Sequence, residues 1–99
     1  MNRAERASAK ANLKRLFDIY IDEQIYEPWR LKNTCGQRRE YLKRCLQEQI
    51  DEPLFSAEEF METFGHGEVN DARLKQYIQK LNDYVFEGGE EPDIDEYFL

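Results

Sequence analysis

Residues 54–67, LFSAEEFMETFGHG, carry the strongest local folding signal in the chain. Ser56 and Glu59 have the spacing of a capping box, in which each side chain satisfies a backbone N–H at the start of a helix. Phe55 and Phe60 have the spacing of a hydrophobic staple. The glycines that close the stretch are typical of a helix end. This segment therefore predicts a short helix that starts after the serine and stops before the glycines.

Apolar residues recur with helical spacing on both sides of this segment, which predicts three further helices. They cover residues 4–26, residues 34 to just before Pro53, and residues 71–86, where Asn70 or Asp71 starts the helix and Gly88 and Gly89 end it. The residues expected to face inward are Leu13, Leu16, Phe17, Tyr20, Ile21, Gln24, Leu42, Leu46, Gln49, Ile50, Leu74, Tyr77, Ile78, Leu81, Tyr84 and Val85.

The boundary between the first two long helices is set by Pro28, because the residue before a proline disfavours helical geometry. Trp29 and Leu31 are then expected in a short connection. Thr34 and Gln37 have capping-box spacing and would start the next helix, with Asn33 as the competing N-cap.

These patterns together predict an all-α protein, a small irregular four-helix bundle with a short acidic C-terminal tail. Residues 1–89 form the single helical domain and residues 90–99 form the tail. Residues 1–11 carry alanines and charges but no large apolar side chain apart from Met1. That segment is therefore expected either to project as a helical arm or to fray.

Composition indicates a soluble domain of the cytoplasm. The 99 residues are 40% hydrophobic, which is enough for one core, and no stretch approaches the roughly 20 apolar residues of a membrane span. The N-terminus lacks the apolar segment of a secretory signal. Cys35 and Cys45 fall on one predicted helix about 15 Å apart, too far for a mutual disulfide. Reduced thiols are expected, and a redox role stays open.

Catalytic and metal chemistry have few candidate residues. His66 is the only histidine and lies between two glycines, while Ser56 is committed to a cap and Ser8 lies in the polar first turns. No paired cysteine or histidine spacing suits zinc, and no glycine-rich stretch has the lysine of a phosphate-binding loop. We therefore expect no enzyme activity, no cofactor and no metal.

Charge is distributed unevenly along the chain. Between Arg3 and Arg44 there are eleven basic and six acidic residues, whereas residues 45–99 contain three basic and fifteen acidic ones. The basic part offers an alternative function, a regulator that contacts nucleic acid or another anion through Gln37, Arg38, Arg39, Lys43 and Arg44. The net charge of −7 and the acidic tail, which would repel phosphate, weigh against it.

The chain ends in EGGEEPDIDEYFL, residues 87–99, with six carboxylate side chains and an aromatic and aliphatic end. This composition resembles the acidic tails with hydrophobic tips of single-stranded DNA-binding proteins, which recruit partner proteins. The resemblance covers about ten residues and lacks the terminal proline of those tips. Two fates are open: the apolar end folds back onto the core, which we favour for Phe98 and Leu99, or it enters a basic, apolar pocket on a partner.

We therefore expect a non-catalytic protein-binding module, a small acidic regulator or inhibitor that docks on a basic surface of a partner protein. In composition it is similar to small acidic inhibitors of nucleic-acid-binding or defence machinery, including phage-encoded DNA mimics. Residual apolar surface also allows a homodimer. The residues expected to form the acidic–aromatic contact face and tail are Glu62, Glu68, Tyr77, Asp83, Tyr84, Glu90, Glu91, Asp93, Asp95, Glu96, Tyr97 and Phe98.

Overall fold

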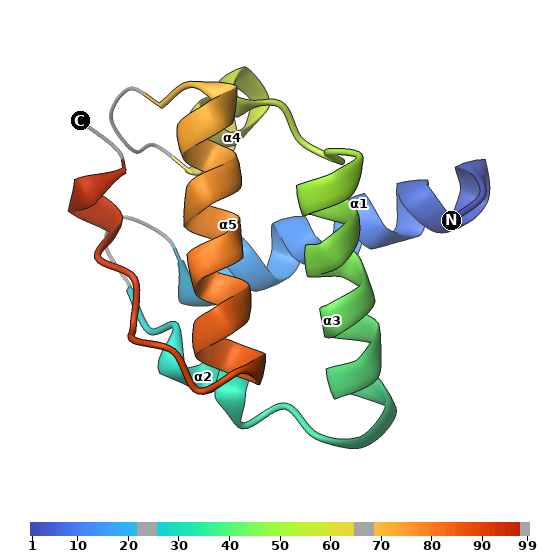
Figure 1. The fold of residues 1–99 in the computed structure, drawn as a ribbon. Coiled ribbons are helices and arrows are strands. Elements are labelled where there is room, and N and C mark those ends of the chain that lie inside the picture. Colours follow the sequence, from blue (N-terminus) through green and yellow to red (C-terminus); the bar gives the residue numbers. More distant parts are fainter. Residues whose placement is uncertain (22–25, 65–68, 98–99) are drawn as a thin grey trace.

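The computed structural model describes residues 1–21, 26–64 and 69–97, and over these ranges the protein is all-α, as predicted (Figure 1). Its elements in chain order are α1 (Arg3–Tyr20), α2 (Trp29–Lys32), α3 (Gly36–Asp51), α4 (Ala57–Phe64), α5 (Asp71–Phe86) and the short 3₁₀ helix η1 (Ile94–Glu96). Helix α2 replaces the predicted connection between the first two long helices.

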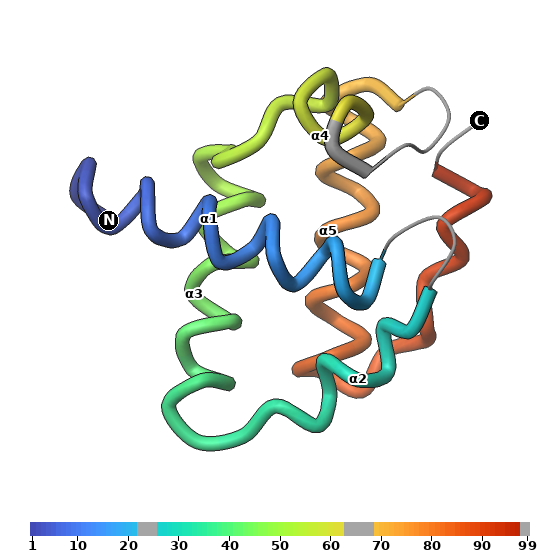
Figure 2. The backbone as a smooth tube through the Cα atoms, turned by 180° about the vertical axis from the view of Figure 1, so that it is seen from behind, coloured from blue at the N-terminus to red at the C-terminus, as the bar shows by residue number. Residues whose placement is uncertain are grey.

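Helices α3 and α5 run side by side in opposite directions, and α1 crosses the pair (Figures 1 and 2). The arrangement buries one continuous core to which every α-helix contributes. Its largest fully buried side chains include Phe17 from α1, Leu31 from α2, Leu46 from α3, Phe60 from α4 and Tyr77 from α5. The short helix α2 therefore belongs to the core through Leu31, although it spans little more than one turn.

The caps predicted for α4 and α5 are confirmed. The Ser56 hydroxyl accepts the N–H of Glu59 at 3.1 Å, and the Glu59 carboxylate accepts the N–H of Ser56 at 3.3 Å. Asn70 caps α5 by accepting the N–H of Arg73 at 2.8 Å. These motifs depend on residues within one turn of each other, which explains why local spacing was sufficient to find them.

The predicted start of α3 is wrong. Thr34 does not cap it, because the Thr34 N–H donates to Leu31 O at 3.2 Å and so completes the end of α2. Asn33, the competing candidate, is the C-cap of α2. The N-cap of α3 is instead Cys35, which makes no side-chain capping hydrogen bond. Gly36 follows with φ +64°, a left-handed conformation that favours glycine and turns the chain into the helix.

Helix α1 ends at Tyr20, six residues earlier than predicted. Ile21 is its C-cap and forms an isolated antiparallel bridge with Tyr26, and the Glu27 N–H donates to Tyr20 O. The backbones at Ile21 and Tyr26 therefore lie side by side in antiparallel orientation. Gln24, which we expected to face inward, lies outside the described residues.

The N-terminal turns of α1 are helical from Arg3, with Asn2 capping the N–H of Glu5 at 2.8 Å. Arg6 forms ion pairs with Glu48 and Glu52. Lys10 pairs with Glu59 in the same way. Ala9 is fully buried, so its small side chain lets this part of α1 approach the core closely. Ion pairs and the buried Ala9 thus hold the first turns of α1, and Met1 also packs against the core.

Gln49 is the one buried polar side chain of the described core. Its Oε1 accepts the N–H groups of Leu54 and Phe55, both at 2.9 Å, and its Nε2 donates to Phe55 O at 3.0 Å. One side chain therefore satisfies three backbone groups of the segment that connects α3 to α4.

No helix in the described ranges combines the length and apolarity that crossing a membrane requires.

Candidate interaction surfaces

The acidic strap, which we define as residues 87–97, follows directly from the end of α5. Gly88 adopts φ +74°, and the N–H groups of Glu87 and Gly89 both donate to Asp83 O, at 2.8 and 3.0 Å. A Cβ on Gly89 would approach Asp83 to 3.2 Å, so a side chain there would crowd the end of the helix. The two glycines thus turn the chain back along the body (Figure 1).

The middle of the strap is fixed to the body by a tyrosine. Pro92 is buried, and its carbonyl oxygen accepts the Tyr26 hydroxyl at 2.7 Å. The Tyr26 oxygen lies 3.2 Å from the hydroxyl of Tyr77. A carbonyl oxygen can only accept a hydrogen bond, so the Tyr26 hydroxyl is the donor to Pro92 O. The hydrogen bond between the two tyrosines is therefore donated by the Tyr77 hydroxyl and accepted by the Tyr26 oxygen.

The end of the strap packs on the same tyrosine of α5. The ring of Tyr97 lies edge-on to Tyr77, with 5.6 Å between ring centroids, and Ile94 and Tyr97 both contact the core. The intervening turn is η1, where the Asp93 carboxylate accepts the N–H of Asp95 at 3.0 Å. Pro92, Ile94 and Tyr97 are therefore the anchors of the strap. Phe98 and Leu99, for which we predicted docking onto the core, lie outside the described residues.

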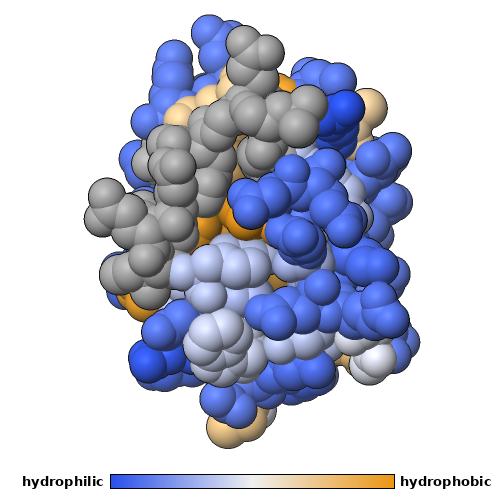
Figure 3. All heavy atoms as spheres, turned by 90° about the vertical axis from the view of Figure 1, so that its left-hand side faces the viewer, coloured by the Kyte–Doolittle hydropathy of each residue, from blue (hydrophilic) through white to orange (hydrophobic). Residues whose placement is uncertain are grey.

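The acidic residues of the strap are all exposed. They are Glu87, Glu90, Glu91, Asp93, Asp95 and Glu96, and the strap contains no basic residue. Within the described part of the chain none of them takes part in an ion pair. Figure 3 shows the side of the molecule that carries the strap, where hydrophilic residues cover most of the described surface.

The negative charge of the strap affects the tyrosines beneath it. Burial is the main cause that raises the pKa of Tyr26 from 10.0 to about 12, and the charges of Glu91 and Asp93 add to the increase. Burial followed by the charge of Glu91 also raises the pKa of Tyr84. These phenols therefore remain protonated, and available as hydrogen-bond donors, well beyond neutral pH.

Two tyrosines predicted for the contact face are covered. Tyr77 has no exposed surface, so its assignment to the contact face is wrong, and Tyr84 is only 9% exposed, with the Lys32 ammonium 4.0 Å from its ring centroid. Both belong to the buried side of α5, as their helical spacing predicted. Tyr26 and the strap contact Tyr77 on that side, and the sequence pattern of one helix contains no information about a distant segment.

The predicted acidic residues outside the strap do not all fall beside it. Asp83 is exposed on the last turn of α5, where its backbone oxygen receives the start of the strap. Glu62 is exposed on α4, a different element. Glu68 lies outside the described residues. The acidic surface that the structure supports therefore consists of Asp83 and the six strap carboxylates.

The basic residues of the alternative hypothesis do not form one surface. Arg39 donates to Val85 O at 3.0 Å and lies over the Phe86 ring, and the Lys43 ammonium lies 5.9 Å from the centroid of the same ring. Arg44 pairs with Glu5 at 3.4 Å. Arg39 and Arg44 therefore serve to hold α3 against its neighbours. Gln37 and Arg38 are exposed, and Arg38 lines the pocket described next.

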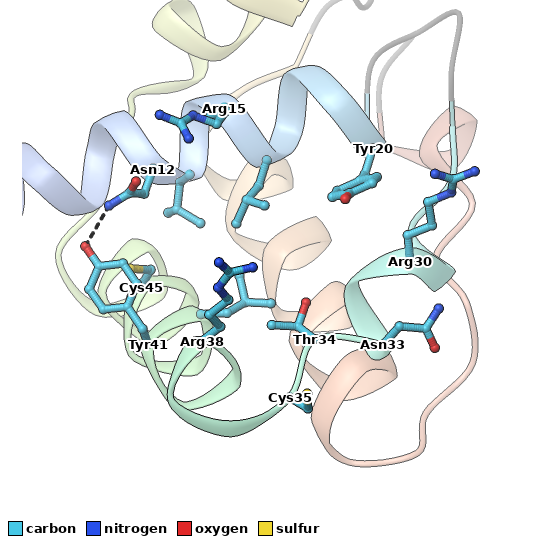
Figure 4. Close-up of a pocket in the computed structure, with 13 residues that line it drawn as sticks. Asn12, Arg15, Tyr20, Arg30, Asn33, Thr34, Cys35, Arg38, Tyr41 and Cys45 are labelled. Carbon is cyan, nitrogen blue, oxygen red and sulfur yellow. Dashed lines mark hydrogen bonds between the residues drawn. The ribbon is translucent and has the colours of Figure 1, made fainter.

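That pocket has a volume of about 640 Å³ and lies between α1, α2 and α3 (Figure 4). Its polar lining contains Asn12, Arg15, Tyr20, Arg30, Asn33, Thr34, Cys35, Arg38 and Tyr41, and its apolar lining contains Leu13, Leu16, Leu42 and Cys45. The sequence did not reveal it, because its lining residues come from three separate elements and from the segment between α2 and α3.

Residues with reactive or ligating side chains are sparse. Cys35 is exposed, Cys45 is buried, both are free thiols, and burial raises the pKa of Cys45. Over residues 1–21, 26–64 and 69–97 no three histidine, cysteine or carboxylate side chains gather as a metal would require. His66 lies outside these ranges.

Comparisons with known proteins give no match: no protein family, no curated protein and no solved structure is significantly similar to this chain. The interpretation of the surfaces therefore depends on their geometry and charge.

Proposed function

We propose that this protein is a non-catalytic binding module, a small acidic regulator or inhibitor whose strap docks on the basic surface of a partner protein. The observation that carries the proposal is the pairing of anchored backbone with exposed charge. The backbone is held through Pro92, Ile94 and Tyr97, while the six acidic residues of 87–97 are exposed and form no described ion pair.

Anchoring matters for affinity. A free acidic tail loses backbone and side-chain entropy when it binds, at a cost of about 1–2 kcal/mol for each residue whose backbone becomes fixed. In the strap much of that cost is already met by folding, so the charge attraction is available for association. Complementary charge chiefly raises the association rate, and the effect declines as salt is added.

The class of partner follows from the charge. Six carboxylates within eleven residues give a charge density that suits a cluster of arginines or lysines. We propose a protein whose basic surface serves nucleic-acid binding, which the strap would occupy in place of phosphate. Direct nucleic-acid binding by the strap would be opposed by the same charges, which is why the protein-binding function is preferred.

A pulldown with charge-neutral variants tests this proposal. The triple variant Glu90→Gln, Glu91→Gln and Glu96→Gln removes three strap charges and leaves every anchor in place. A matched control, Asp18→Asn, Glu40→Gln and Glu58→Gln, removes three exposed charges outside the strap. Both variants change the net charge equally, so only the position of the charges differs.

The proposal expects a specific partner that the wild-type protein retains at low salt and releases at high salt. The control variant should retain that partner and the strap variant should lose it. Equal retention by both variants, or a complex that survives high salt unchanged, would show that the strap is not the docking surface. Thermal melting of all three proteins establishes that each variant is folded.

A further inference from the structure

The pocket between α1, α2 and α3 is independent of the acidic strap, since none of its lining residues belongs to residues 87–97. Its volume of about 640 Å³ falls within the range of roughly 300–1,000 Å³ typical of small-molecule sites. The pocket therefore has the size to hold a compact ligand.

The charged residues that line the pocket in the described part of the chain are all basic. Arg15 comes from α1, Arg30 from α2 and Arg38 from α3, and none of the described lining residues is an aspartate or glutamate. Of the three, Arg30 pairs with Glu27, which lies outside the lining. Arg15 and Arg38 form no ion pair with any described residue. Figure 4 shows Arg38 reaching from α3 toward α1 across the middle of the pocket.

The remainder of the lining is apolar and aromatic. Leu13 and Leu42 are buried beneath the pocket, while Tyr20 and Tyr41 are half-buried at its sides. Tyr41 is held in place by Asn12, whose Nδ2 donates to its hydroxyl at 3.1 Å across the gap between α3 and α1 (Figure 4). The hydrogen bond between Asn12 and Tyr41 therefore links α1 and α3 along one wall of the pocket before any ligand binds.

We infer that this pocket binds a small organic phosphate with a flat aromatic body, for which a nucleotide is the natural probe. A guanidinium group can bind a phosphate through two parallel charge-assisted hydrogen bonds, and two arginines without described ion pairs are available for it. The half-buried tyrosines offer flat surfaces for a base, which stacks well on aromatic rings. Thr34 and Asn33 add hydroxyl and amide groups that can orient the ligand.

The N-terminus of α3 reinforces the positive potential without being the site itself. Thr34 and Cys35 line the mouth of the pocket, and Cys35 leaves the first turn of α3 without a side-chain cap. The N–H groups at such a helix end carry partial positive charge. The arginines and the helix end therefore favour the same sign of ligand charge.

Binding is tested by titrating the isotope-labelled full chain with four probes while recording ¹H–¹⁵N NMR spectra. The probes are a nucleoside monophosphate, the matching nucleoside, inorganic phosphate and a single-stranded oligonucleotide of the same base. The inference expects saturable shifts for amides of Thr34–Arg38, Asn12–Leu16 and Tyr41, with the monophosphate binding more tightly than either of its parts. If the oligonucleotide binds more tightly than the monophosphate and shifts the same amides, the ligand of the pocket is a nucleotide within a single strand.

Arg38→Gln is the decisive variant, because Arg38 is exposed and its removal should not affect folding. Loss of one charged hydrogen-bonding group is expected to weaken binding of the monophosphate by roughly tenfold or more. Arg3→Gln is the matched control, since Arg3 is exposed and outside the pocket. Shifts that do not saturate, that map elsewhere, or that Arg38→Gln leaves unchanged would overturn the inference.

Discussion

Replacing Gln49 by methionine tests the most interconnected part of the core. Methionine keeps the length and approximate volume of the side chain but removes its donor and its acceptor. The substitution eliminates two hydrogen bonds from the N–H groups of Leu54 and Phe55 and one to Phe55 O, all within 3.0 Å in the native protein.

The magnitude follows from burial. Gln49 is 2% exposed, so water cannot easily replace the lost groups. Deleting the partner of a buried polar group costs about 1–3 kcal/mol. Three such groups, offset by the greater hydrophobicity of methionine, suggest a loss of about 3–5 kcal/mol in the free energy of unfolding. That is a large part of the 5–15 kcal/mol typical of a domain, and it corresponds to a fall in Tm of more than about 10 °C.

Urea denaturation followed by far-UV circular dichroism measures this loss, and amide hydrogen exchange at Leu54 locates it. Gln47→Met is the matched control, because Gln47 is exposed on the same helix and its side chain bonds only to Asp51 at 3.1 Å. It should change stability by less than about 0.5 kcal/mol. If Gln49→Met is no less stable than Gln47→Met, the three hydrogen bonds do not carry the connection between α3 and α4.

Three further predictions concern the strap and the thiols. Tyr26→Phe removes the hydrogen bond to Pro92 O and should cost about 1–2 kcal/mol in urea denaturation, whereas Tyr20→Phe, which loses no described hydrogen bond, should cost less than about 0.5 kcal/mol. The pKa of Tyr26 rises to about 12 on folding, so the stability contributed by its protonated hydroxyl is complete below pH 10 and is lost between about pH 10 and 12. A free energy of unfolding that stays constant over that range would contradict this prediction. Iodoacetamide at pH 8 should label Cys35 and spare Cys45 until the protein unfolds, as mass spectrometry of the modified peptides would show.

Local sequence patterns were sufficient where the forces are local. The Ser56 and Glu59 capping box, the Asn70 cap and the end of α5 before Gly88 each depend on groups within a few residues. The sequence also predicted which residues of α3 face inward, including Gln49, because the spacing of apolar residues along a helix is enough to assign a residue to one face.

Local patterns failed where a distant segment decides the outcome. The residues after Tyr20 could continue a helix by propensity, but α1 ends at Tyr20, and Tyr26 instead donates a hydrogen bond to Pro92 O, 66 positions further along. Arg39 looked like part of an exposed basic surface, yet it donates to Val85 O on α5. Tertiary contacts of this kind override the local preference, and no single-helix pattern encodes them.

Contacts between distant segments also decide how the charged residues are arranged, so the charge pattern of the sequence could not predict that arrangement. The acidic end was conspicuous in sequence, but its two fates differed by the balance of chain entropy against burial of a few apolar groups. The structure places Pro92, Ile94 and Tyr97 against the body while the carboxylates remain outside. The pocket of Arg15, Arg30 and Arg38 had no sequence signal, since its residues come from three separate elements.

The order of the strap in solution is the most direct test of this account, and ¹⁵N relaxation measures it residue by residue. Amides of Asp93–Tyr97 should have order parameters close to those of α5, near the value of about 0.85 typical of rigid backbone, and the Tyr97 ring should show nuclear Overhauser contacts to Tyr77. Order parameters below about 0.6 across these residues, with no contact between the two rings, would mean that the carboxylates belong to a free tail and not to a preorganised docking surface.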